Sequence, residues 1–148
     1  MGAFVAEVAL RWSDLDAFGH VNHARTVTLL EEARAGLLFV EAERQGLLGM
    51  AEGMVVARVL VDYHAPLTYS AGTLQVRMSV RELKAASFVM DYTACAQGDA
   101  AVATAETLMV PYDLREGRPR RLTADERDFL AEWQLARGTE PASEFTRA

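Results

Sequence analysis

The stretch NHARTVTLLEEARAGLLFVEAERQ, residues 22–45, carries the longest helical pattern of the chain. At 100° per residue, one continuous apolar face is formed by Leu29, Leu30, Ala33, Gly36, Leu37 and Val40. The back of the helix is apolar as well, since it carries Ala24, Val27, Leu38, Phe39 and Ala42. A helix that is apolar around most of its circumference is usually buried. We therefore expect one long helix that the rest of the chain encloses.

Strands are predicted on both sides of this helix. Residues 4–12 alternate in polarity, and one face carries Phe4, Ala6, Val8, Leu10 and Trp12. After a loop marked by glycines, further strands are predicted at 55–63, 73–83, 87–97 and 100–110. In the first of these, one side is shared by Val55, Ala57, Val59, Val61 and Tyr63. The dipeptide Gly98-Asp99 predicts a tight hairpin turn, and Pro111 is expected to close the last strand.

This order of elements predicts an α+β fold, in which an antiparallel sheet of about five strands wraps around one long central helix. We expect a single domain over residues 1–148, with its core at about 4–113. A polar loop with several arginines follows at 113–121. Thr123 and Glu126 then form a capping box that opens a short C-terminal helix, expected at about 123–137.

Composition excludes several classes of protein. With 148 residues, 51% hydrophobic and 24% charged, the chain is a globular domain rather than a disordered one. The single cysteine, Cys95, excludes a disulfide framework and a multi-cysteine zinc site, and is interpreted as a small buried apolar residue. No apolar run is long enough to span a membrane. The N-terminal residues alternate like a strand and lack the basic region of a signal peptide, so we expect a cytoplasmic protein.

The net charge of −6, from 15 basic and 21 acidic residues, argues against nucleic acid or an anionic membrane as the main partner. An acidic protein can still bind a phosphorylated ligand, but only through a few local cations. The arginine-rich composition, in which Lys84 is the one lysine, is attributed first to a GC-rich coding sequence.

The loop before the long helix concentrates the candidate catalytic groups, which are Asp14, Asp16, Gly19, His20, Asn22 and His23. A helix N-terminus presents unpaired backbone N–H groups that can hold an oxyanion developing on a carbonyl. A nearby carboxylate can act as nucleophile or as general base on a water molecule. Gly19 would let the loop pass close to a ligand. These residues therefore favour acyl transfer or hydrolysis.

Structural roles are also expected in this loop. Asn22 is a good N-cap whatever the function, and Asp14 is interpreted first as a turn former. A metal site on the two aspartates and two histidines is disfavoured, because the histidines lack helical ligand spacing and no third well-spaced ligand follows.

Structural roles are also considered for three residues outside the loop. Glu31 and Glu32 are expected to be solvated or salt-bridged. His64 is as well explained by capping or packing as by catalysis.

The segment RWSDLDAFGHVNHAR at 11–25, continued by EEAR at 31–34, resembles the signature of the hot-dog acyl-CoA thioesterases. The nearest branch is the 4-hydroxybenzoyl-CoA thioesterase type, which includes the acyl-CoA thioesterases associated with the Tol-Pal system. Residues 63–74 are similar to the second block of that family, and residues 82–88 resemble the hairpin after it. The resemblance covers about residues 5–112 and implies a hot-dog fold.

This resemblance implies hydrolysis of an acyl-CoA to a free carboxylic acid and coenzyme A, with no metal and no redox cofactor. Asp16 would be the catalytic nucleophile or general base. The backbone N–H of His23 would polarise the thioester oxygen, and its side chain would orient substrate or water. The loop would be shaped by Gly19, His20 and Asn22. The site would lie between two subunits of a dimer, often paired into a tetramer, with Ser87 near the partner's substrate channel.

Two departures from the family pattern affect the substrate. Thr26 stands where the family commonly has an aromatic residue, which alters the pocket wall. The basic run before Ser87 is reduced to Lys84-Ala85-Ala86, so Lys84, Arg81 or the basic loop at 113–121 would hold the nucleotide part of coenzyme A.

Three other hypotheses on substrate and function stay open at this point. They are an acyl-carrier-protein thioester as the substrate, a hot-dog dehydratase or hydratase, and a protein that binds acyl-CoA or an aromatic acid without turnover.

Overall fold

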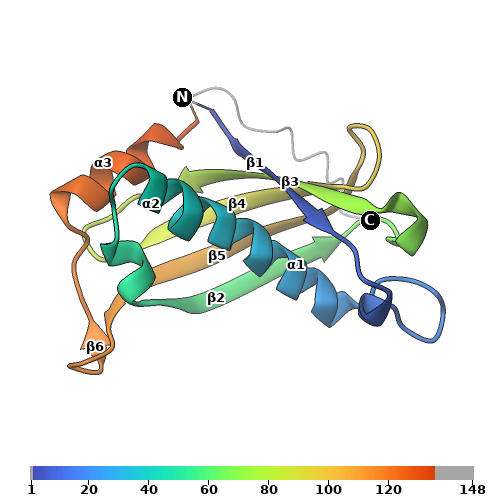
Figure 1. Ribbon diagram of the computed structural model, residues 1–148, viewed down its shortest axis with the longest axis horizontal. Helices are drawn as coiled ribbons and strands as arrows, with labels where there is room; N and C mark the ends of the chain where they lie inside the picture. The colour runs from blue at the N-terminus through green and yellow to red at the C-terminus, as the bar shows by residue number, and fades with distance from the viewer. Residues whose placement is uncertain (1, 136–148) are drawn as a thin grey trace, which may run out of the picture.

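Figure 1 shows the computed structural model, which describes residues 2–135. The long helix lies across one face of an antiparallel sheet with strand order β1-β3-β4-β5-β2. The strands are β1 (Phe4–Ala9), β2 (Met54–Tyr63), β3 (Thr73–Arg81), β4 (Phe88–Cys95) and β5 (Ala101–Asp113), and the two-residue strand β6 (Arg118–Pro119) pairs with β5. The predicted α+β architecture, a curved sheet against one long helix, is confirmed.

The helix begins and ends where the sequence predicted, but in its second half other side chains than predicted face the core. It consists of α1 (His23–Ala35), a π-helical segment (Gly36–Glu41) and α2 (Ala42–Arg44). A π segment inserts an extra residue and shifts the phase of all that follows. Leu38 and Ala42, predicted on the back, are therefore buried, whereas Val40, predicted on the core face, is 68% exposed.

The first strand is shorter than predicted. β1 ends at Ala9, and a 3-10 turn over Trp12–Asp14 follows. Leu10 is buried as expected, but Trp12 is 77% exposed, so its placement on the core face is wrong. The alternation cannot extend through residue 12, because the turn rotates the side chains out of the strand's two-residue period.

The last strand is longer than predicted, because Pro111 does not end it. β5 continues to Asp113, and beyond Pro111 it pairs with β6. Pro111 lies opposite Met54, and its carbonyl oxygen accepts a hydrogen bond from the Arg120 N–H at 3.0 Å. The missing N–H of proline is therefore tolerated at this position near the end of the ladder.

A β-bulge divides the strand β2. The register with β5 shifts between Val56 and Arg58. Val59, Val61 and Tyr63 share one face, as predicted, but the shift moves Val55 to the other face. The strand is at the edge of the sheet, and most of its side chains are exposed.

The chain after β6 covers the end of the sheet where β3 finishes. Helix α3 spans Ala124–Glu132 and begins at the predicted capping box of Thr123 and Glu126. It ends earlier than the expected residue 137, since Trp133 already lies outside the helix, and residues 136 and 137 lie outside the described part of the chain. The Trp133 carbonyl accepts from the Val80 N–H at 3.0 Å, which covers the edge of β3 beyond β1.

The core lies between the long helix and the sheet. The predicted inward residues of β3, namely Leu74, Val76, Met78 and Val80, are all buried. Cys95 is buried, as the sequence indicated. No helix among residues 2–135 is long and apolar enough to cross a membrane.

Candidate active site at the start of the long helix

The loop before α1 is closed on itself by backbone hydrogen bonds. Leu15 and Val21 form an isolated antiparallel bridge, and the Asn22 N–H donates to the Asp14 carbonyl at 2.9 Å. The Asp14 side chain is only 1% exposed, and its Oδ2 accepts from the Arg11 N–H at 3.0 Å and lies 3.4 Å from the Arg11 Nε. Asp14 therefore fixes the turn, as the sequence suggested, and faces no ligand.

Asp16 is held by the same loop in a different environment. Its Oδ1 accepts hydrogen bonds from the Phe18 N–H at 2.8 Å and the His20 N–H at 3.2 Å. Gly19 makes this tight loop possible, because its φ of 77° lies in the left-handed region. No donor among residues 2–135 bonds to Oδ2 of Asp16. One carboxylate oxygen thus orients the group, and the other is available for chemistry.

The helix N-terminus next to Asp16 is capped as predicted. The Asn22 side chain accepts from the Ala24 N–H at 2.9 Å. His23 is the first helical residue, and no acceptor within residues 2–135 bonds to its backbone N–H. The His23 carbonyl accepts from the Tyr63 hydroxyl at 2.7 Å, and the His23 imidazole and the Tyr63 ring meet edge to face. Partial burial raises the pKa of Tyr63 above its usual value, so the hydroxyl remains a donor well into the alkaline range.

A pocket of about 400 Å³ opens at this helix start. It is lined by Asp16, His20, Val21, His23, Thr26, Tyr63, His64, Ala65, Pro66, Leu67, Val102 and Ala103. Three of the predicted site residues, Asp16, His20 and His23, are therefore brought together. Thr26, expected in the pocket wall, also lies there. Gly19 and Asn22 support the loop and the helix cap without lining the cavity.

Ser87 and Lys84 lie at the opposite end of the sheet from this pocket. They belong to the turn between β3 and β4, where the Lys84 N–H donates to the Ser87 carbonyl at 2.9 Å. The next residue, Phe88, pairs with Met109, whereas the pocket touches Ala103 on the same strand β5. Six residues of extended strand separate the two ends by about 20 Å. Within one chain, the structure does not bring Ser87 or Lys84 to the site.

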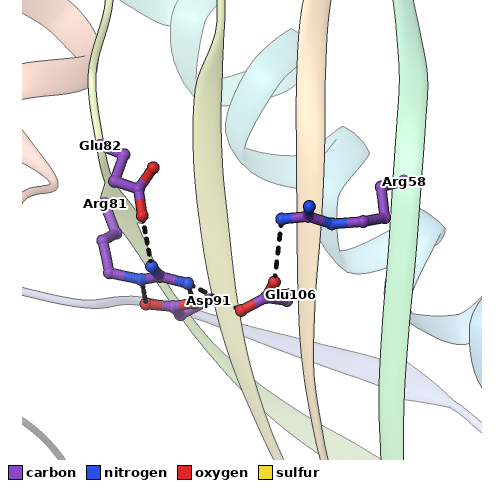
Figure 2. A network of polar contacts seen from close by, with 5 residues as sticks. All are labelled: Arg58, Arg81, Glu82, Asp91 and Glu106. Carbon is purple, nitrogen blue, oxygen red and sulfur yellow. Dashed lines mark hydrogen bonds and ion pairs between the residues drawn. The ribbon is translucent and has the colours of Figure 1, made fainter.

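Arg81, another candidate for binding the nucleotide, is already engaged. Figure 2 shows its guanidinium among three carboxylates on the sheet face opposite the helix, bonded to Glu82 at 2.7 Å, Asp91 at 2.9 Å and Glu106 at 2.7 Å. Arg58 contributes a second cation to the same network through Glu106. Arg81 therefore has no free charge to offer a phosphate.

Most of the other pocket residues were missed by the sequence analysis. His64, for which capping or packing was as good an explanation as catalysis, bonds through Nε2 to the Thr104 hydroxyl at 2.8 Å and also lines the pocket. Tyr63 and Pro66 lie in the block 63–74 that resembles the family, which was the available signal. Val102 and Ala103 carry no signal of their own, because only the pairing of β2 with β5 places Ala103 opposite Tyr63 and the Val102 carbonyl within 2.8 Å of the His64 N–H. Within residues 2–135, no three His, Cys, Asp or Glu side chains gather as a metal site would require.

The chain matches known proteins over most of its length. The model of the thioesterase-like superfamily matches residues 10–134. The acyl-CoA thioester hydrolase YbgC of Escherichia coli O6:H1 is 28% identical over 116 residues, or 78% of this chain and 86% of that protein.

Solved structures share the fold. A predicted thioesterase from Bacillus stearothermophilus has a TM-score of 0.75 at 22% identity, covering 92% of this chain and 99% of that one. A thioesterase from Thermus thermophilus, complexed with coenzyme A and Zn, has a TM-score of 0.70 at 26% identity, covering 88% and 92% of the two chains.

Proposed function

The chain belongs to the thioesterase-like superfamily, and on this premise we propose that it hydrolyses acyl-CoA thioesters to a carboxylic acid and coenzyme A. The observation that carries the proposal is the pocket that Asp16 and the first residue of α1 line together. A carboxylate and a helix N-terminus on one cavity supply the two groups that acyl transfer to water requires. The expected hot-dog fold and thioesterase family are confirmed.

Asp16 acts on the carbonyl carbon of the thioester. Either its free oxygen attacks that carbon, giving a mixed anhydride that water then hydrolyses, or it removes a proton from the water that attacks. In both routes a C–O bond forms, the C–S bond breaks and coenzyme A leaves as the thiolate, which then takes a proton. Oδ1 stays bonded to the loop N–H groups, so the carboxylate enters the reaction already oriented.

The start of α1 stabilises the charge that develops on the thioester oxygen. The His23 N–H is the donor, and the positive end of the helix dipole adds to its effect. The Tyr63 hydroxyl bonded to the His23 carbonyl holds this first turn in place. The His23 side chain, which lines the same pocket, orients substrate or water.

The exposed edge strand β2 supports the proposal of a dimer. It pairs with β5 on one side only, and Val55, Val56, Val59 and Leu60 are each at least 38% exposed. An apolar edge strand of ten residues invites pairing with a second copy about a two-fold axis. In such a dimer, Ser87 and Lys84 serve the partner's site. Pairing of dimers into a tetramer and a cytoplasmic location stay predictions.

The turn that carries Lys84 also gathers other cations. The Arg127 guanidinium donates to the Lys84 carbonyl at 2.6 Å, and the Leu122 N–H donates to the Ala85 carbonyl at 2.9 Å, which places Arg121 nearby in the chain. Within residues 2–135, none of these three cations has a carboxylate within 4.0 Å. They are free to bind the phosphates of coenzyme A.

Thiol release from a panel of acyl-CoA esters tests the proposal. Turnover of at least one ester by the wild-type protein, at a rate proportional to enzyme concentration, is the expected result. Tight binding of acyl-CoA with no thiol release would instead favour a binding protein. Hydration of an enoyl-CoA with its thioester intact would favour a hydratase.

A further inference from the structure

Arg34 is a half-buried cation that has no acidic partner within residues 2–135. It lies near the end of α1, and its Nη1 donates to the Tyr92 hydroxyl at 3.3 Å. That hydroxyl also bonds to the Thr107 hydroxyl at 2.8 Å. Tyr92 and Thr107 are buried, and no carboxylate within residues 2–135 lies within 4.0 Å of the Arg34 guanidinium. Glu31, one turn earlier on the helix, does not pair with it.

These groups stand at the far end of an apolar strip that begins at the proposed active site. The strip follows the cross-strand pairs of β2 and β5, from Tyr63 and Ala103 at the pocket through Val61 and Ala105 to Val59 and Thr107. Its β5 side chains are small, and Val59 is 42% exposed. Four residues of strand span about 13 Å.

The distance along the helix agrees with that along the sheet. Arg34 lies eleven residues after His23, which corresponds to about 16 Å of helix, and its side chain leans back toward the N-terminus. The guanidinium therefore lies on the order of 10 Å from the donor that would hold the thioester oxygen. An acyl chain lying on the strip would reach it with its far end.

From this arrangement we infer that Arg34 selects acyl groups that end in a carboxylate. A guanidinium taken partly out of water without a counter-charge is costly, and it gains most from an anion that arrives with the ligand. The Tyr92 and Thr107 hydroxyls hold the guanidinium in place and add a donor for the same group. This inference rests on the proposed thioester hydrolysis and specifies its substrate class: CoA esters of dicarboxylic acids.

The alternative is that a carboxylate of the partner subunit occupies the same position. In that case, loss of Arg34 would weaken the dimer and slow all substrates alike. If Arg34 recognises the acyl end, its loss instead changes the ratio of the kcat/KM values for two substrates of equal length. A structural role of Arg34 would not change that ratio. The ratio is therefore the decisive readout.

The experiment compares kcat/KM for suberoyl-CoA and octanoyl-CoA, and for the shorter pair adipoyl-CoA and hexanoyl-CoA. We expect the wild-type protein to prefer the carboxylated ester of each pair, more strongly in the longer pair. Arg34→Gln should lower that preference by about 10- to 100-fold, and Arg34→Lys should lower it less. Arg77→Gln removes one exposed cation from β3, where it pairs with Asp99, and should leave the ratio unchanged.

Equal rates for the two esters of each pair in the wild-type protein would overturn the inference while leaving thioester hydrolysis intact. A uniform loss for both esters in Arg34→Gln would overturn it as well. Absence of thiol release from every ester would instead refute the proposed function. If Arg34→Gln does not fold, inhibition of the wild-type enzyme by free suberate, stronger than by octanoate, carries the same test.

Discussion

Two aspartates two residues apart have different surroundings within the same loop. Asp14 is buried against the backbone it caps, whereas Asp16 lines the pocket with one oxygen free of donors from residues 2–135. Burial and hydrogen bonding thus leave only the second of two identical side chains facing the pocket, where the proposed mechanism uses it. The turn-forming role of Asp14 was predictable from the sequence, because it depends on hydrogen bonds within a few residues, whereas the catalytic role of Asp16 is implied by the family resemblance and stays a prediction.

Asp14→Ala tests the structural role. The substitution leaves the Arg11 N–H without its acceptor in a partly buried site, so we expect a loss of about 1–3 kcal/mol in the free energy of unfolding. Urea denaturation followed by circular dichroism measures it. Asp14→Asn keeps an acceptor and should lose less. Equal stability of Asp14→Ala and the wild-type protein would contradict this assignment.

Other residues of the site could not be predicted, because they come together through strand register. Asn22 caps the helix that starts at the loop, as the sequence predicted, and Thr26 on that helix lines the pocket, as the resemblance implied. Ala103 and Tyr63 face the pocket only because β2 and β5 pair with a bulge between Val56 and Arg58. A single sequence carries no signal for that register.

Glu41 gives a residue-scale test of the helix end. Hydrogen bonds from Arg44 and then from Gln45 lower its pKa from 4.5 to about 2. A lowered pKa means that the contact stabilises the folded state above pH about 4.5 and is lost as pH falls toward 2. NMR titration of the Glu41 side chain should give the low value, and Arg44→Ala should return it toward 4.5. An unchanged pKa in that variant would contradict the stated cause.

At the scale of elements, the helix ends were predictable and the phase of the helix was not. Asn22 caps the helix, and the predicted end at Gln45 follows the last helical residue, Arg44. The π segment at Gly36–Glu41 then exchanges Val40 for Leu38 and Ala42 on the core face. A fixed helical period cannot include such a segment.

Two glycines in neighbouring elements should respond oppositely to alanine. A Cβ on Gly53 would collide with the carbonyl oxygen of Tyr112, where the loop before β2 pairs with β5. A Cβ on Gly36 would meet only Phe4, at an ordinary 3.7 Å. We expect Gly53→Ala to destabilise by about 1–3 kcal/mol and Gly36→Ala to be neutral or stabilising by about 0.5–1 kcal/mol. Thermal unfolding of both variants checks this, and a reversed order would refute it.

At the scale of the whole molecule, one chain holds only part of the proposed site. The sequence indicated an acidic domain with few free cations, and the structure ties several of them into ion pairs, including Arg81 and Arg58. Lys84 and Ser87 lie about 20 Å from the pocket in the same chain. The distance of Lys84 and Ser87 from the pocket could not be predicted from residue spacing, since it depends on which end of the sheet carries the turn between β3 and β4.

The proposed dimer predicts a particle of about twice the chain mass of 16.3 kDa. Val59→Lys places a charge on the exposed edge strand β2 and should shift the equilibrium toward monomer. Val5→Lys makes the same change on β1, the other edge strand, at a similarly exposed position. It should leave the mass unchanged. Sedimentation velocity distinguishes these outcomes, and a monomeric wild-type protein would refute the dimer.

The most direct test of the account is the rate of thiol release by Asp16→Asn, measured on the best acyl-CoA ester of the wild-type protein. Asparagine keeps an acceptor for the Phe18 and His20 N–H groups but can neither attack the carbonyl nor take a proton from water. We predict a fall of about 10²- to 10⁴-fold in kcat, with unchanged mass and unfolding temperature. A kcat within a few-fold of the wild-type value would contradict the assignment of Asp16 as the catalytic residue.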